Sequence, residues 1–217
     1  TPMHSSSRNR KSNPFLMKKI LFLFLAACFF FSCEKETIVI PQQHAGRTVL
    51  AFFWADNSLN SNLRNNIRTM MQGLQAMKDS AALLVYWDGE ASDISWPEPC
   101  IVEYVTNGQG GINSMSKEAV NAMIADQDMS VHDLISIGNI RKKYSPQTST
   151  EKTVMQTVIG DMMSVYPSES YGIIFGSHGS GWLPTITGTR SIGQDGGRYS
   201  SDTALIPELA EVLRTVN

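Results

Sequence analysis

The sequence predicts an α/β domain with a mainly parallel sheet, because short apolar runs alternate with amphipathic segments along the chain. Thr48–Trp54 is a continuous apolar run, which is typical of a strand buried on both faces. Ala81–Trp87 is a second such run, and the turn-forming pair Asp88-Gly89 closes it. Between the two runs, apolar residues recur every three or four positions over 59–78, as on one face of a helix. A strand–helix–strand unit of this kind requires a right-handed crossover and a parallel pair.

The later part of the chain continues this alternation. Asp56-Asn57-Ser58 offers capping side chains for the helix that follows the first strand. The other elements are expected, in order, as a short edge or hairpin strand at Ile101–Val105, helices at Lys117–Ala125 and Thr150–Tyr166, a buried strand at Tyr171–Phe175, a long polar loop at Thr185–Ser201 and a last helix from Pro207 to Val216. No internal repeat is evident.

Charge is distributed unevenly over the 217 residues. Residues 1–32 hold five basic and no acidic side chains, whereas the remainder holds 13 basic and 20 acidic side chains, a net charge of −7. An acidic body has no basic surface with which to neutralise phosphates, so nucleic acid is not expected as a partner.

The amino-terminal segment has the pattern of a bacterial secretion signal. Met17-Lys18-Lys19 precedes the apolar run 20–31, which at 12 residues is shorter than the ~20 needed to span a membrane. Ser32-Cys33 resembles a lipoprotein processing site, at which Cys33 would be acylated and become the new first residue. A signal removed by ordinary cleavage and an uncleaved anchor are the alternatives. The lipoprotein interpretation places the protein in the cell envelope, on the periplasmic or extracellular side of the cytoplasmic or outer membrane.

These features divide the chain into four segments. We expect an upstream, non-native extension at 1–16, a signal peptide at 17–32, a lipid-anchored linker at 33–46 and the amino-terminal part of a larger domain at 47–217. The body at 47–217 contains a single cysteine, Cys100, so no disulfide is expected within it. Cys100 lies between a proline-rich turn and a short strand and has no adjacent glycine, which favours a structural thiol over a nucleophile.

One histidine stands where catalytic groups are commonly found. His178 follows the apolar run Tyr171–Phe175 and lies in the glycine-rich stretch 176–181. In open α/β sheets, ligands bind beyond the carboxyl ends of strands, and glycine lets a backbone N–H approach a reacting atom. A base beside an accessible N–H is what acyl transfer requires, although a structural histidine in a glycine-rich loop fits the same spacing.

Three stretches of the chain are similar to the clostripain family of cysteine peptidases. Ser177–Trp182 resembles the histidine motif of that family, and Thr48–Leu59 resembles its opening strand and Ala-Asp-Asn-x-Leu turn. The stretches 192–195 and 205–209 resemble the region after the histidine more weakly. The resemblance implies a caspase-like three-layer α/β/α sandwich, incomplete in this chain, and a cysteine endopeptidase that cleaves polypeptides after Arg or Lys.

The same resemblance assigns roles to individual residues. It implies that His178 is the general base and that the N–H of Gly179 stabilises the oxyanion. The cysteine of the family lies in an Asp-Ala-Cys-like segment on the next strand, which does not occur before Asn217. We therefore expect an amino-terminal part that is inactive alone. A non-enzymatic surface lipoprotein with the same fold is the main alternative, and a serine hydrolase using Ser177 or Ser180 is a weaker one.

Maturation and cofactors complete the expectations. The resemblance implies internal cleavage after a basic residue in the loop that follows the histidine, for which we favour Arg190 over Arg198; an ordinary solvated arginine is the alternative. No cofactor is expected. Calcium dependence would be consistent with the family, but Asp126-x-Asp128-x-Ser130 lacks the Gly and Glu of a calcium loop at its later positions.

Overall fold

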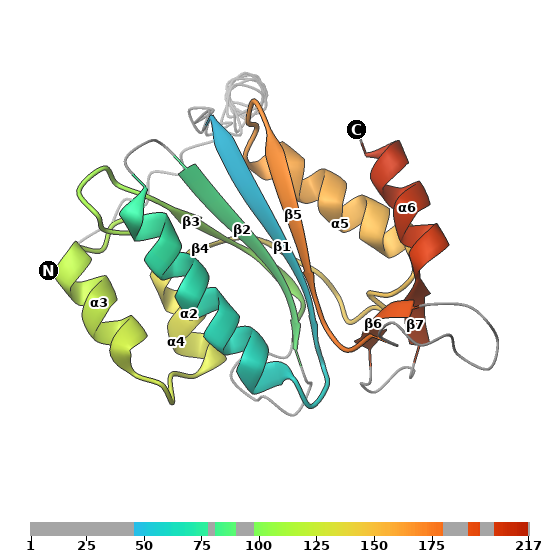
Figure 1. The fold of residues 1–217 in the computed structure, drawn as a ribbon, viewed down its shortest axis with the longest axis horizontal. Coiled ribbons are helices and arrows are strands. Elements are labelled where there is room, and N and C mark those ends of the chain that lie inside the picture. Colours follow the sequence, from blue (N-terminus) through green and yellow to red (C-terminus); the bar gives the residue numbers. More distant parts are fainter. Residues whose placement is uncertain (1–45, 78–80, 90–97, 180–190, 196–201, 217) are drawn as a thin grey trace, which may run out of the picture. The chain divides into compact units, whose positions relative to one another are not determined.

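A five-stranded sheet forms the centre of the structure, a computed structural model that describes residues 46–77, 81–89, 98–179, 191–195 and 202–216 (Figure 1). Its strands lie in the order β4-β3-β2-β1-β5. Their bounds are β1 Arg47–Ala55, β2 Ala81–Gly89, β3 Cys100–Val105, β4 Asn139–Lys143 and β5 Tyr171–Gly176. A separate two-stranded ladder joins β6 (Ser191–Asp195) to β7 (Asp202–Leu205).

Pairing within the main sheet is mixed. β1 pairs in parallel with β2 on one side and with β5 on the other, as the strand–helix–strand pattern requires. β3 and β4 are added in antiparallel orientation beyond β2. The parallel expectation therefore holds for the three strands nearest the histidine, and the far side of the sheet is antiparallel. β3 lies between β2 and β4 and pairs in antiparallel with β2, the strand before it, so of the two expected places the edge is wrong and the hairpin pairing is confirmed.

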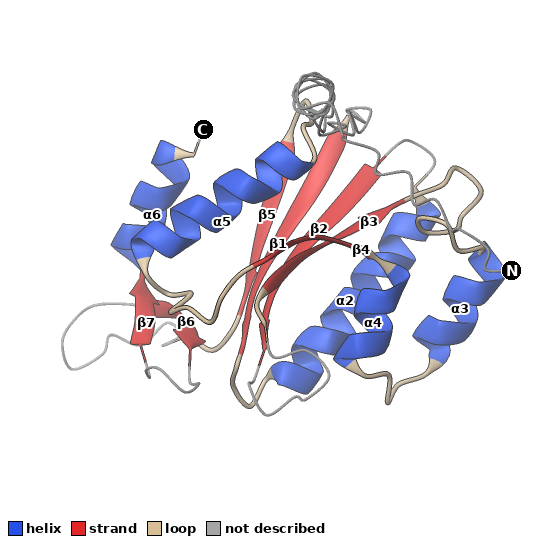
Figure 2. Ribbon diagram, turned by 180° about the vertical axis from the view of Figure 1, so that it is seen from behind, coloured by secondary structure: helices blue, strands red, loops and turns tan. Residues whose placement is uncertain are grey.

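Helices cover both faces of the sheet and make the three-layer α/β/α sandwich (Figures 1 and 2). One face carries α2 (Asn60–Ala76), α3 (Lys117–Ala125) and α4 (Val131–Ile137), and the other carries α5 (Lys152–Val165) and α6 (Ile206–Thr215). Figure 2 shows the strands between these two groups of helices.

The apolar run of β1 is buried because both of its faces are covered. Ala51 and Phe53 pack with α2 in one core, whereas Phe52 and Trp54 pack with α5 in the other. All four side chains are at most 1 % exposed. Because successive side chains of a strand point to opposite faces, a strand inside two apolar layers must be apolar throughout.

Four elements of the structure, α4, β4, β6 and β7, differ from the sequence expectations. α4 and β4 were not expected, and part of the loop expected at Thr185–Ser201 forms β6. Ser130 is the N-cap of α4. Its hydroxyl accepts from the N–H of Asp133, while the Asp133 carboxylate accepts from the N–H of Ser130. The bonds from Ser130 lower the pKa of Asp133 below its usual value. This capping box explains how a helix of only seven residues begins where it does.

Candidate active site

The carboxyl ends of β1 and β5 lie side by side and bring two loops together. The two strands are parallel neighbours in which Phe53 pairs with Gly176. The residues that follow β1, Asp56 to Ser58, therefore lie next to Ser177 and His178, which follow β5. This is the edge at which ligands bind in open α/β sheets, and it is where the sequence places the histidine.

A hydroxyl contacts the ring of this histidine. The Oγ atom of Ser58 lies 2.9 Å from Nε2 of His178, a hydrogen-bond distance. Ser58 is exposed and His178 is partly buried, so the ring is held at one nitrogen at the surface of the protein. Among the described residues, no hydrogen bond involves Nδ1 of His178.

Asn57 joins the two loops. Its side-chain amide donates to the carbonyl of Trp54 at 2.6 Å and to the hydroxyl of Ser177 at 3.2 Å. Its carbonyl oxygen accepts from the N–H of Leu59 at 2.9 Å. One side chain thus fixes the turn after β1 and links it to the residue before His178. None of the three expected capping residues is the N-cap of α2, which is Leu59 and has no side-chain cap bond.

β6 fixes the backbone of the histidine. The N–H of Gly193 donates to the carbonyl of His178 at 2.9 Å, and Gly179 forms an antiparallel bridge with Ile192. Because the bond from Gly193 to His178 flanks this bridge, Gly179 and Ile192 form a non-hydrogen-bonded pair, in which the N–H of Gly179 points away from β6. No hydrogen bond in the described part of the chain uses the N–H of Gly179. No described residue therefore competes with a ligand for this donor.

Two glycines allow the close approaches on which this geometry depends. A Cβ atom added at Gly176 would lie 2.5 Å from the Phe53 ring and 2.8 Å from Leu63. Gly193 has a φ of +86°, and an added Cβ would meet the Trp54 ring at 3.1 Å. A side chain at either position would displace β5 or β6 and with it the backbone of His178.

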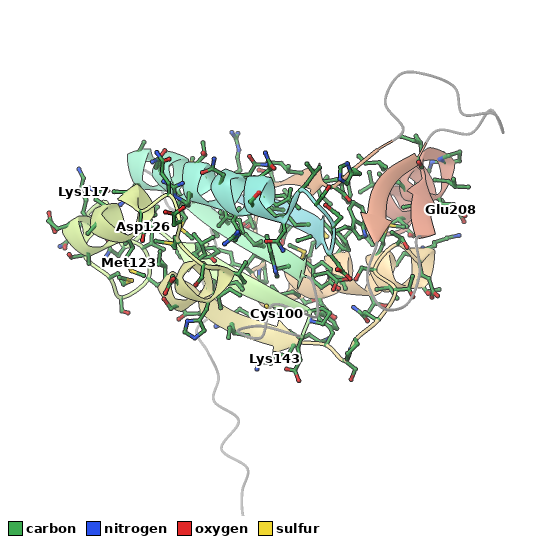
Figure 3. The ribbon with its side chains drawn as sticks, turned by 90° about the horizontal axis from the view of Figure 1, so that it is seen from below. Cys100, Lys117, Met123, Asp126, Lys143 and Glu208 are labelled. Atoms are coloured by element: carbon green, nitrogen blue, oxygen red, sulfur yellow. The ribbon has the colours of Figure 1, made fainter. Side chains whose placement is uncertain are left out.

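Cys100 is not placed to act with the histidine. It is fully buried at the start of β3, and β2 and β1 separate it from β5, the strand that leads to His178. Three strand spacings amount to ~14 Å. In Figure 3, Cys100 lies beside Lys143 of the neighbouring strand β4, its pairing partner. The expectation of a structural thiol is consistent with this burial.

A buried polar network lies at the carboxyl ends of β1 and β2, the same edge of the sheet. The Asp88 carboxylate at the end of β2 accepts from the hydroxyl of Ser149, which also bonds the Tyr86 hydroxyl at 2.7 Å. The indole N–H of Trp54 donates to the carbonyl of Ser149 at 2.9 Å. The network ties the ends of β1 and β2 to the segment that enters α5. Sequence analysis missed it, although Asp88 directly after an apolar strand was a signal.

Some of the remaining candidate residues are described by the structure and others are not. Cys33, Arg190, Arg198 and Ser180 lie outside the described residues. The hydroxyl of Ser177 accepts from Asn57. Asp126, at the end of α3 in Figure 3, accepts from the N–H of Asp128. No group of three His, Cys, Asp or Glu side chains within the described residues could hold a metal ion.

The comparisons with known proteins agree with the motif. The sequence profile of the clostripain family, peptidase C11, matches residues 51–217. This chain belongs to the clostripain family. No curated protein matches it. No helix in the described part of the chain is long and apolar enough to cross a membrane.

Two solved structures of the clostripain family share the fold. One is a secreted C11 cysteine protease from Bacteroides thetaiotaomicron with an irreversible peptide inhibitor, 25% identical with a TM-score of 0.55; the match covers 80% of this chain and 40% of that one. The other is a secreted C11 cysteine protease of the same organism named iotapain, 15% identical with a TM-score of 0.53, for which the shares are 80% and 43%. This chain thus spans less than half the length of either.

Proposed function

We propose that this chain is the amino-terminal part of a cysteine endopeptidase in which His178 is the general base. The observation that carries the proposal is the position of His178 at the carboxyl end of β5, beside the N–H of Gly179, to which no described residue is bonded. Membership of the clostripain family supports a cysteine as the nucleophile. Because Cys100 is buried three strands away, we expect that cysteine in a later segment of the polypeptide.

The proposed chemistry uses the geometry in two steps. His178 takes the proton of the thiol, and the thiolate attacks the carbonyl carbon of the scissile peptide bond. The N–H of Gly179 donates to the oxyanion that forms, and His178 then returns the proton to the departing amine. A water molecule hydrolyses the thioester, with His178 again accepting a proton, and this releases the acid and restores the thiol.

The outer side of β5 offers a place for the strand that carries the nucleophile. β5 pairs only with β1 among the described strands. A parallel strand added there would end beside His178, because the carboxyl ends of parallel strands meet at one edge. Without that strand, we expect the 217-residue chain to hydrolyse no peptide. A preference for Arg or Lys before the scissile bond is part of the proposal and rests on the family.

The same proposal includes export and maturation. A lipid on Cys33 would hold the protein on the periplasmic or extracellular side of a bacterial membrane, and the secreted relatives support export. Cleavage after Arg190 would divide the chain directly before Ser191, the first residue of β6. Mass spectrometry of the protein purified from membranes should find acylated Cys33 at one amino terminus and Ser191 at another. An unmodified Cys33 would contradict the proposed lipid anchor. An active chain that stays in one piece would contradict the proposed cleavage.

The decisive experiment is hydrolysis of an arginyl peptide substrate by the product of the whole reading frame. His178→Ala should lower kcat by ~100-fold or more, since general acid–base catalysis contributes that much. Ser177→Ala should retain activity, whereas its loss would favour a serine nucleophile. If the wild-type protein binds the peptide without cleaving it, the proposal of a peptidase is wrong and a binding module is favoured.

A further inference from the structure

The contact between Ser58 and His178 extends the proposed mechanism to a second side chain. We propose that Ser58 is the positioning residue of His178: its hydroxyl accepts a hydrogen bond from Nε2–H and leaves Nδ1 as the nitrogen that takes the proton. The catalytic role of this contact rests on the proposed function, in which His178 is the general base. Its geometric basis is the 2.9 Å separation of Ser58 Oγ and His178 Nε2.

The assignment of the two ring nitrogens follows from the chemistry of the imidazole. A neutral imidazole carries one N–H donor and one lone pair, and a base must present the lone pair to the proton that it takes. Nε2 faces Ser58, and no described residue forms a hydrogen bond with Nδ1. If Ser58 donated to Nε2, the proton would reside on Nδ1, and the only lone pair of the ring would face Ser58 instead of an incoming thiol. For a thiol to be the proton donor, Ser58 must therefore accept.

A hydroxyl can hold this role throughout the reaction. When His178 takes a proton, both of its nitrogens become donors. The Ser58 oxygen continues to accept from Nε2–H, so the ring does not have to turn between the neutral and the charged state. The gain is a fixed ring direction, which is what a base needs in order to meet the thiol in a reactive geometry.

The structure holds Ser58 in place for this contact. Asn57, the residue before it, bonds the carbonyl of Trp54, the N–H of Leu59 and the hydroxyl of Ser177. The loops that carry Ser58 and His178 are thereby joined to each other. Ser58 also lies next to the N-cap of α2, where serine commonly caps a helix, yet its hydroxyl contacts the histidine and α2 has no side-chain cap.

The first test reads the ring directly in the 217-residue chain. Nitrogen-15 spectra of His178 report which ring nitrogen is protonated in the neutral form. The wild type should hold the proton on Nε2, and Ser58→Ala should move toward the mixture of a free imidazole. Ser58→Thr, which keeps the hydroxyl, should behave as the wild type. Ser61→Ala is the matched control, because Ser61 is an exposed serine in the first turn of α2.

The second test reads catalysis in the product of the whole reading frame. Ser58→Ala should lower kcat by about 10-fold, the effect of one hydrogen bond of ordinary strength, and leave KM within about twofold. Ser58→Thr should restore kcat, and Ser61→Ala should not change it. Identical far-UV circular dichroism of the variants checks that the fold is intact.

Three results would overturn the inference. They are an Nε2 signal that does not respond to Ser58→Ala, a kcat equal to that of the wild type, and covalent labelling of Ser58 by a fluorophosphonate, which would make this serine the nucleophile. The spectra decide the role of Ser58 even if the protein hydrolyses no peptide. Failure of this inference and failure of the proposed peptidase are therefore distinguishable.

Discussion

The two outer strands of the sheet are built from opposite kinds of side chain. β4, with the sequence Asn-Ile-Arg-Lys-Lys, is charged and largely exposed. β5, with the sequence Tyr-Gly-Ile-Ile-Phe-Gly, has no charge at all. Each presents one exposed isoleucine, Ile140 at 39% and Ile174 at 41%. The two edges therefore differ in the residues around each isoleucine and not in how exposed the isoleucine is.

β4 has the features by which natural sheets protect an edge. Its ladder with β3 shifts register between the pairs formed by Ile140 and Lys142, so Arg141 is the extra residue of a β-bulge. Arg141 pairs with the buried carboxylate of Glu103 at 3.3 Å, and Lys142 pairs with Asp161 of α5 at 2.5 Å. Charges, bulges and ties to the next layer all discourage pairing with another strand.

Within its described residues, β5 carries no charge and no bulge, although the Tyr171 hydroxyl ties it to α5 through the Met163 carbonyl. Ile174 lines an apolar cleft of about 280 Å³ between β5 and α2, together with Val49, Met70 and Met77. An uncharged strand beside such a cleft is suited to the interior of a larger sheet. This difference between the edges agrees with the proposal that a further strand pairs with β5, next to His178, and not with β4.

The largest effect that we expect at either edge is the loss of Arg141. Arg141→Met would leave the Glu103 carboxylate, 8% exposed, as a buried charge without its partner. We expect it to lower the free energy of unfolding by ~2–3 kcal/mol in a urea titration of residues 34–217. Lys143→Met is the matched control. Its partner Glu98 is 52% exposed, so the change should stay within ~0.5 kcal/mol.

Equal losses in these two variants would contradict the view that β4 is fixed by Glu103. The double variant Glu103→Gln with Arg141→Met should recover part of the stability, because it removes the unpaired charge together with its partner. A double variant as unstable as Arg141→Met alone would assign the loss to packing of the arginine stem instead.

A second, smaller effect should appear in self-association. Residues 34–217 should associate as concentration rises, through the unpaired edge of β5. Ile174→Lys places a charge on that edge and should shift sedimentation toward the monomer, with little change in unfolding free energy. Ile140→Lys adds the same charge to β4 and should leave association unchanged. If both variants reduce association equally, or if the wild type stays monomeric, the edges do not differ in the way described.

The elements that sequence analysis predicted are those with a strong local pattern. β1, α2, β2, α3, α5, β5 and α6 have continuous or periodic apolar residues, and their bounds in the structure differ little from the expected ones. β4 and β6 could not be found in this way. The sequence Asn-Ile-Arg-Lys-Lys resembles a loop, and only its ladder with β3 makes it a strand. β6 is defined by its pairing with β7 and by the bond from Gly193 to His178.

Part of the candidate site, like these elements, could be predicted from the sequence. His178 was predicted from its motif, because glycines after an apolar strand form a local signal. Ser58 and Asn57 were interpreted as capping residues, and their contacts with His178 and Ser177 were not predicted. These contacts span 120 residues and exist because β1 and β5 are neighbours. The place of β5 beside β1 depends on tertiary packing, which a local sequence pattern does not reveal.

The smallest expected effect is a pH dependence at the β4 edge. Tyr144, directly after β4, donates its hydroxyl proton to Asp161 of α5 at 2.8 Å, beside the Lys142 ion pair. Partial burial and the Asp161 carboxylate raise the pKa of Tyr144 above its usual 10. The folded state therefore retains this proton where the unfolded chain has lost it. Stability from Tyr144 is complete below pH 10 and falls as pH rises above 10.

Tyr144→Phe should make the unfolding free energy less dependent on pH between about 9 and 11, compared with the wild type. Lysines and other tyrosines titrate in the same range, but they are common to both proteins and cancel in the difference. Tyr171→Phe is the matched control at the other edge. Within the described part of the chain, the Tyr171 hydroxyl bonds the N–H of Ser168 and the carbonyls of Met163 and Tyr166, all of them backbone groups, and it bonds no carboxylate. Parallel pH curves for the wild type and Tyr144→Phe would show that the hydroxyl does not tie β4 to α5, and the protection of that edge would then rest on Arg141 and Lys142.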